Sequence, residues 1–153
     1  MNTIISYFHI SNAIFALIFG VCIFLMHKGS RIHKIFGYGY VISMATLNIS
    51  AMLIYRLTGH FGPFHGAAIA SFITLVAGFI PAWRRKPSIQ WLEYHYQFMC
   101  WSYAGLVAAG ASEVMTRVPA SPFWPAVMAT SVFIFLVSGY LISQYNAKDL
   151  VKK

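Results

Sequence analysis

The sequence predicts an all-α protein, a bundle of five helices that cross a membrane. Of its 153 residues, 59% are hydrophobic and only 9% are charged, whereas soluble domains carry about 25% charged residues. The apolar residues gather into five runs of about 20 residues, which is the length that a helix needs to cross the hydrocarbon core of a bilayer. Spans fill the chain, so we expect one transmembrane bundle over residues 1–153 without a separate soluble domain.

Turn and capping residues separate the five apolar runs. The expected spans cover residues 4–26, 35–55, 65–83, 94–115 and 125–145. Ser30 is a suitable N-cap before the second span, and Pro63 interrupts the chain before the third. Pro87 precedes the fourth helix, and Pro125 suits the first turn of the fifth. Each boundary therefore has a local cause.

The basic residues predict the orientation of the bundle. Nine of them fall in the first loop, the third loop and the tail: Lys28, Arg31, Lys34, Arg84, Arg85, Lys86, Lys148, Lys152 and Lys153. Only Arg56 and Arg117 fall on the other side. Cytoplasmic loops are rich in Lys and Arg, so we expect the N-terminus outside and the C-terminus in the cytoplasm of a multi-pass inner-membrane protein. The net charge of +8 is then a topology signal and does not indicate nucleic-acid binding.

Small and polar residues form one stripe at helical spacing on three of the expected helices. The stripe of the second span is His33, Gly37, Tyr40, Met44, Asn48, Ala51 and Tyr55. That of the fourth is His95, Met99, Ser102, Leu106, Ala109 and Glu113, and that of the first is His9, Asn12, Ala16, Gly20 and His27. Ionisable groups are costly in hydrocarbon, so these stripes are predicted to face the interior, with Asn48 in mid-membrane.

Haem b is one interpretation of the histidines, because imidazole is a normal axial ligand of haem iron. His33 and His95 come from two helices at similar depth near the cytoplasmic side. His9 and His65 are at similar depth near the outer side. Gly37, one turn beyond His33, would leave room for a flat macrocycle.

A metal site at the outer side is a second interpretation. His60 and His65 would supply two ligands, Glu113 a carboxylate and His9 a fourth ligand. Zinc takes nitrogen and oxygen donors in this number, and an open coordination position permits hydrolysis. This set would make the protein a metal-dependent membrane hydrolase.

A third interpretation is a pocket for a quinone or another small ligand, or a permeation path. Its lining would be Tyr38, Tyr40, Asn48, Ser102 and Glu113. A small transporter, a homo-oligomer or an accessory subunit of a membrane complex would also fit. Interfacial histidines often only anchor helices, and a simple ion pair with Arg117 would also explain Glu113.

Three motifs resemble a family of small bacterial multi-span inner-membrane proteins that is catalogued as a domain of unknown function. The motifs are His33-Lys34 with Gly37, Phe61-Gly62 with His65, and His95 with Met99, within residues 28–113. The resemblance implies a multi-span bundle in which His33, His65 and His95 matter. It includes neither His9 nor His60, and it implies no activity.

Together these observations favour a haem- or quinone-associated electron-transfer component of the inner membrane. The cofactor residues expected are His33, His95, Gly37, Asn48 and Met99. Zinc at the outer site is a separate hypothesis, and whether the protein is an enzyme stays open.

Overall fold

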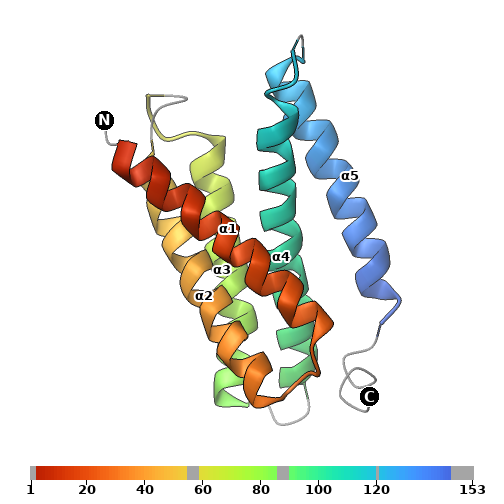
Figure 1. Cartoon of the computed structure of the whole chain (residues 1–153). Coiled ribbons are helices and arrows are strands. Elements are labelled where there is room, and N and C mark those ends of the chain that lie inside the picture. Colours follow the sequence, from red (N-terminus) through yellow and green to blue (C-terminus); the bar gives the residue numbers. More distant parts are fainter. Residues whose placement is uncertain (1–2, 55–58, 86–89, 120, 146–153) are drawn as a thin grey trace.

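The computed structural model describes residues 3–54, 59–85, 90–119 and 121–145. Within these ranges the chain forms α-helices and no strand. The helices are α1 (Thr3–Leu25), α2 (Arg31–Met52), α3 (Pro63–Arg84), α4 (Trp91–Met115) and α5 (Phe123–Ser143) (Figure 1). The predicted all-helical class and the order of the elements are confirmed.

The helix ends follow the capping residues more closely than the apolar runs. The Ser30 hydroxyl accepts a hydrogen bond from the His33 N–H at 3.0 Å, so α2 begins at Arg31, before its apolar stretch. Pro125 lies in the first turn of α5, as predicted, whereas Pro63, expected to interrupt the chain before the third span, is the first residue of α3. Pro87 and Tyr55 lie outside the described residues.

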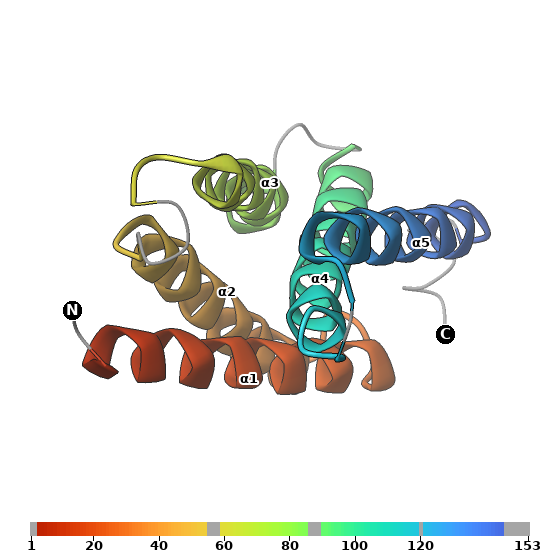
Figure 2. The same cartoon turned by 90° about the horizontal axis from the view of Figure 1, so that it is seen from above.

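The five helices run alternately up and down. Each packs against the next along the chain, and α1 also contacts α4 (Figures 1 and 2). Helix α4 is central, and α5 packs on α4 alone among the described helices. The backbones of α2 and α4 face each other across the bundle without direct packing. Contact between these two helices is therefore left to their side chains.

Apolar side chains fill the space between α1, α2, α3 and α4. The buried core is Ala16, Tyr40, Met44, Leu47, Leu75 and Leu106. Glycine allows the close approach of α1 and α4, because a Cβ built on Gly20 would lie 2.1 Å from the ring of Tyr103. Small residues commonly allow such approach in membrane bundles, where dispersion contacts hold helices together.

The outer surface of the bundle is apolar, as a lipid-facing surface must be. Helices α1, α2, α3 and α5 are each long and apolar enough to cross a membrane. Helix α4 is not among them in the described part of the chain. It carries polar residues such as Glu93, Gln97 and Ser102 along its length. A central helix exposes less surface to lipid than its neighbours, so it tolerates more of them.

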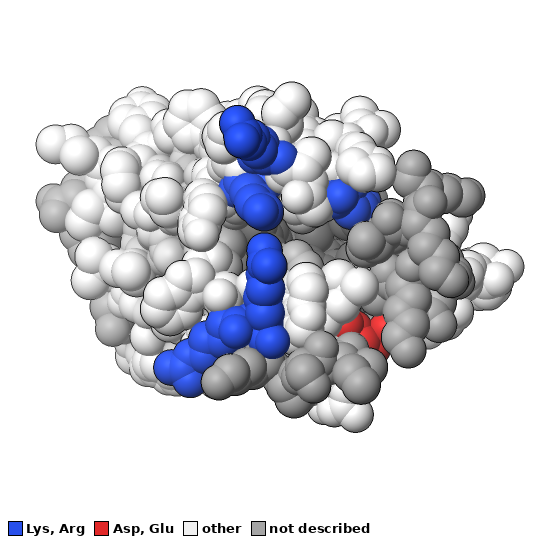
Figure 3. Space-filling model, turned by 90° about the horizontal axis from the view of Figure 1, so that it is seen from below, with Lys and Arg blue, Asp and Glu red and all other residues white. Residues whose placement is uncertain are grey.

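Basic side chains gather at one end of the bundle (Figure 3). This end carries the α1–α2 connection and the C-terminal end of α3. Lys28 closes α1 there, since its ammonium donates hydrogen bonds to the carbonyl oxygens of Ile23 and Phe24 at 2.5 and 2.9 Å. Burial lowers the pKa of Lys28. We call this the basic end, and the opposite end the outer end.

Candidate histidine site

His95 lies in the second turn of α4, near the basic end. Its Nδ1 is 2.9 Å from the carbonyl oxygen of Gly78 on α3. A carbonyl oxygen only accepts hydrogen bonds, so Nδ1 must carry the proton and a neutral ring presents a lone pair at Nε2. The fold therefore fixes both the tautomer and one edge of the ring.

His33 lies in the first turn of α2 and is half-buried. Its ring centroid is 6.4 Å from that of His95, with the two ring planes at 81°. The Nδ1 atom of His33 is buried and has no hydrogen-bond partner among the described residues. The bundle thus brings together the two histidines predicted to share a site, from two helices whose backbones do not pack directly against each other.

The separation of the rings suits a shared metal. An imidazole nitrogen binds a metal at about 2 Å, so two rings on opposite sides of one metal hold their nitrogens about 4 Å apart. Adding the radius of each ring gives a centroid separation close to that of His33 and His95. To ligate one metal between them, the two rings would need to rotate, but the distance between their centroids could stay nearly the same.

Two further residues expected at this site have different roles. A Cβ built on Gly37 would meet nothing within 4 Å, so space is open one turn from His33. Met99 packs against α3 instead, because a Cβ built on Gly78 would lie 2.9 Å from the Met99 sulfur. Gly78 therefore has two roles: its lack of a side chain lets α3 and α4 cross closely, and its carbonyl oxygen orients His95.

Asn48 lies apart from the histidine pair. It is 15 residues after His33, or about 22 Å at 1.5 Å per residue. Helix α2 ends at Met52, so Asn48 lies one turn from the end of the helix. It does face inward as predicted, with 6% of its surface exposed.

The middle of the bundle joins α2 to α4 through hydroxyl groups. The Tyr40 phenol oxygen is 3.0 Å from the Ser102 hydroxyl oxygen, and both residues are buried. Tyr38 and Glu113, also expected to line an interior path, are exposed. The inward stripe of α4 therefore does not extend to the outer end.

At the outer end, α1 meets α2 through His9. Its Nδ1 is 2.9 Å from the Ser50 hydroxyl oxygen, and that hydroxyl donates to the Leu47 carbonyl oxygen at 2.9 Å. Since the hydroxyl proton is used, the serine oxygen accepts and Nδ1 of His9 carries the proton. Nothing in the sequence pattern singled out Ser50, which is a small residue on the side of α2 next to α1.

The other two outer histidines lie at the start of α3. The Nδ1 atom of His65 accepts a hydrogen bond from the Gly62 N–H at 3.2 Å, which closes the first turn of the helix. His65 is buried and its ring stacks on Phe61. His60 is exposed, with Nδ1 2.9 Å from the Phe61 carbonyl oxygen.

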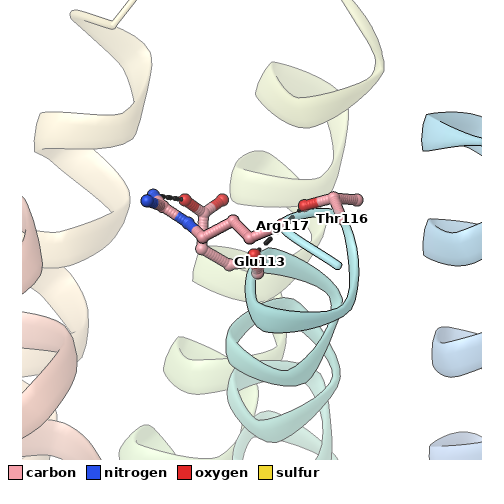
Figure 4. Close-up of polar contacts among 3 residues, drawn as sticks. All are labelled: Glu113, Thr116 and Arg117. Carbon is pink, nitrogen blue, oxygen red and sulfur yellow. Dashed lines mark hydrogen bonds and ion pairs between the residues drawn. The ribbon is translucent and has the colours of Figure 1, made fainter. Parts of the chain in front are cut away.

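Glu113, in the last turn of α4, pairs with Arg117 just beyond the end of the helix (Figure 4). Their side chains are 66% and 74% exposed and point away from α5. Across the described ranges, no group of three or more His, Cys, Asp or Glu side chains could hold a metal ion. His9, His60, His65 and Glu113 are thus not gathered into such a group.

Comparison with known proteins gives a family for this chain. Residues 6–148 match the family described as "Predicted membrane protein (DUF2306)". The match extends beyond the residues 28–113 that carry the motifs and includes most of α1 and all of α5. No curated protein and no solved structure matches the chain.

Proposed function

We propose that this chain, which belongs to the DUF2306 family of predicted membrane proteins, is an electron-transfer component that binds haem b between His33 and His95. The observation that carries the proposal is the tautomer of His95. A metal-bound histidine usually donates its other ring N–H to a carbonyl or carboxylate, and this hydrogen bond orients the ring and raises its basicity. The contact from His95 to Gly78 has this form.

The surroundings of the pair support the same assignment. His33 has a buried nitrogen without a hydrogen-bond partner in the described part of the chain, which is costly in an apolar interior and is relieved by a ligand. The open space at Gly37 would receive an edge of a flat ring system. Arg31 and Lys34, on the same first turns of α2, would face the carboxylates of the haem propionates.

The chain's own residues would hold the group and tune it. Haem supplies one-electron chemistry when bound. His95, whose ring is oriented and made more basic by the Gly78 carbonyl, and His33 would together hold the haem. The apolar core of Met44, Leu75 and Leu106 would keep water from entering through the middle of the bundle.

We also propose that all five helices cross the inner membrane, with the basic end in the cytoplasm. The clustering of Lys and Arg at that end supports this orientation. Helix α4 would cross as the central helix, shielded from lipid by its neighbours. The haem site would then lie near the cytoplasmic side.

A visible spectrum of the protein tests the haem assignment. The chain is purified in detergent from haem-replete cells, and a Soret band that sharpens on reduction is expected. His33→Ala and His95→Ala should each lose the bound haem, as measured by the ratio of Soret to protein absorbance. His27→Ala is the matched control, because His27 is exposed and lies at the same end.

Circular dichroism and gel filtration establish that each variant is folded. A colourless wild-type protein would refute the proposal, and so would a folded His95→Ala variant that keeps its full Soret band. Elemental analysis of the same samples measures iron and also zinc. Stoichiometric zinc that falls in His65→Ala would favour the outer metal site instead.

A further inference from the structure

Asn48 carries a buried donor that the fold leaves unused. Its side-chain nitrogen is buried and has no hydrogen-bond partner among the described residues, and the residue is 6% exposed. An unpaired amide in an apolar interior destabilises the folded state. Buried polar groups in membrane proteins usually face a ligand, a partner or a wet cavity.

The core separates this amide from the histidine pair. Met44, one turn before Asn48 on α2, packs in the buried cluster with Leu75 and Leu106. The pair His33 and His95 lies on the far side of this cluster, toward the basic end. Any occupant at Asn48 must therefore come from the outer end or from the lipid beside it.

Helix α4 is uncovered near Gly110, which lies eight residues beyond Ser102, as Asn48 lies eight residues beyond Tyr40, the hydrogen-bond partner of Ser102. Ser102, Leu106, Ala109 and Glu113 follow one line along α4, each three or four residues after the one before. Ser102 and Leu106 are buried, whereas Ala109 and Glu113 are exposed. A Cβ built on Gly110 would also meet nothing within 4 Å. The packing on this face of α4 thus ends after Leu106.

The oblique course of α1 explains this opening. Toward its C-terminal end α1 contacts α4, where the Tyr103 hydroxyl donates to the Leu17 carbonyl oxygen at 3.4 Å and the ring meets Phe24. Toward its N-terminal end α1 moves away from α4 and follows α2 (Figures 1 and 2). We call the uncovered face at Ala109, Gly110 and Glu113 the outer opening.

We propose that Asn48 binds the carbonyl oxygen of a quinone that enters through the outer opening. An amide N–H is a natural donor to a carbonyl oxygen. Ligand sites of this kind are mostly apolar, with few polar groups to fix orientation, and here the amide stands beside an apolar core. The small residues Ala109 and Gly110 of the outer opening leave space for a flat ring beside Glu113, and a lipid-soluble compound reaches this depth from the bilayer. The site is separate from the histidine pair and does not require haem.

Thermal unfolding with a quinone tests the proposal. The purified chain is placed in dodecyl maltoside, a detergent without a carbonyl group, and a short-tailed ubiquinone is added in excess. Wild-type protein is expected to gain about 5 °C in Tm, because a ligand that binds only the folded state stabilises it. Asn48→Leu should show no shift. Thr46→Val is the matched control on α2, and its shift should equal that of wild type, because the Thr46 hydroxyl bonds only to its own helix at Ile42.

A second variant protects the test against misfolding. Ala109→Trp changes an exposed residue and fills the outer opening, so it should fold and yet lose the quinone shift. Equilibrium dialysis of the quinone should show the same loss in both variants. No shift in wild type, or an equal shift in Asn48→Leu, would overturn the proposal. So would a shift that depends on Asn48 with an ester phospholipid and not with the quinone. A colourless protein would end the haem assignment and leave this test intact.

Discussion

The phenol oxygen of Tyr40 and the hydroxyl oxygen of Ser102 lie 3.0 Å apart at the centre of the bundle. Each residue is 2% exposed. The two helices that they join do not pack directly against each other. Side chains therefore join α2 to α4 at two levels of the bundle: this hydrogen bond at the centre, and the ring contact between His33 and His95 nearer the basic end.

Removing the Tyr40 hydroxyl should weaken the bundle measurably. In Tyr40→Phe the buried Ser102 hydroxyl loses its partner, which should lower the free energy of unfolding by about 1 kcal/mol. Tyr40→Phe with Ser102→Ala should recover part of this loss, giving a coupling energy near the roughly 0.6 kcal/mol typical of hydrogen bonds between membrane helices. Reversible unfolding in mixed micelles measures the free energy of unfolding of wild type, Tyr40→Phe, Ser102→Ala and the double variant. Strictly additive losses would contradict the prediction.

The crossing of α3 and α4 should not tolerate a side chain at Gly78. In Gly78→Ala the new Cβ would lie 3.1 Å from the backbone nitrogen of Met99, which cannot swing aside as a side chain can. The helices must separate, which costs about 1–3 kcal/mol and loosens the hydrogen bond from His95. Unfolding measurements should show this loss.

Gly37→Ala provides the contrast for Gly78. Nothing lies within 4 Å of a Cβ at that position, so the alanine should leave stability unchanged or raise it by roughly 0.5–1 kcal/mol through its better helix propensity. Equal destabilisation by both alanines would show that the crossing at Gly78 is not tight.

The ion pair of Glu113 and Arg117 should contribute little to stability. Both side chains are largely exposed, and exposed ion pairs typically contribute 0–1 kcal/mol, about 0.3–0.5 for pairs four residues apart on a helix. Glu113→Gln should therefore change the free energy of unfolding by no more than about 0.5 kcal/mol. A larger loss would mean that the carboxylate has another partner in the membrane.

Cysteine labelling should place the two ends of the bundle on opposite sides of the membrane. In a Cys22→Ser, Cys100→Ser background, His60→Cys and Val118→Cys should react with a membrane-impermeant maleimide in intact cells. His27→Cys should react only after the membrane is opened. All three positions are exposed, so accessibility and not burial decides the outcome. Labelling of His27→Cys in intact cells would reverse the proposed orientation.

Local signals predicted the helices well. Apolar runs, the Ser30 cap and Pro63 each act within a few residues, so their effects are readable without tertiary structure. They also predicted that α2 is buried along Tyr40, Met44 and Asn48, as the structure confirms. The same periodicity failed at the end of α4. Ala109 and Glu113 continue the stripe in sequence but lie exposed, because spacing on one helix does not tell how far its neighbour follows.

The partners of the candidate site residues were not predictable in the same way. Gly78 lies in an apolar run and has no polar side chain, yet its carbonyl oxygen orients His95. Ser50 likewise binds His9 only because α1 lies along that side of α2. A backbone carbonyl and a small hydroxyl leave no signal in a pattern of hydropathy or titratable residues.

The sequence by itself determined that this chain forms helices, four of them long and apolar enough for a membrane, that Ser30 caps the second of the five helices, and that basic residues gather at one end. Hydrophobic length and capping act along the chain, so these properties are local. Only the tertiary structure decided that His33 meets His95, that Asn48 lies apart from them beyond the core, and that α4 is uncovered near Glu113. These outcomes depend on the angles at which the helices cross. Close contacts such as Gly20 with Tyr103 and Gly78 with Met99 determine these angles. Such contacts join residues far apart in the chain, so the local sequence does not reveal them.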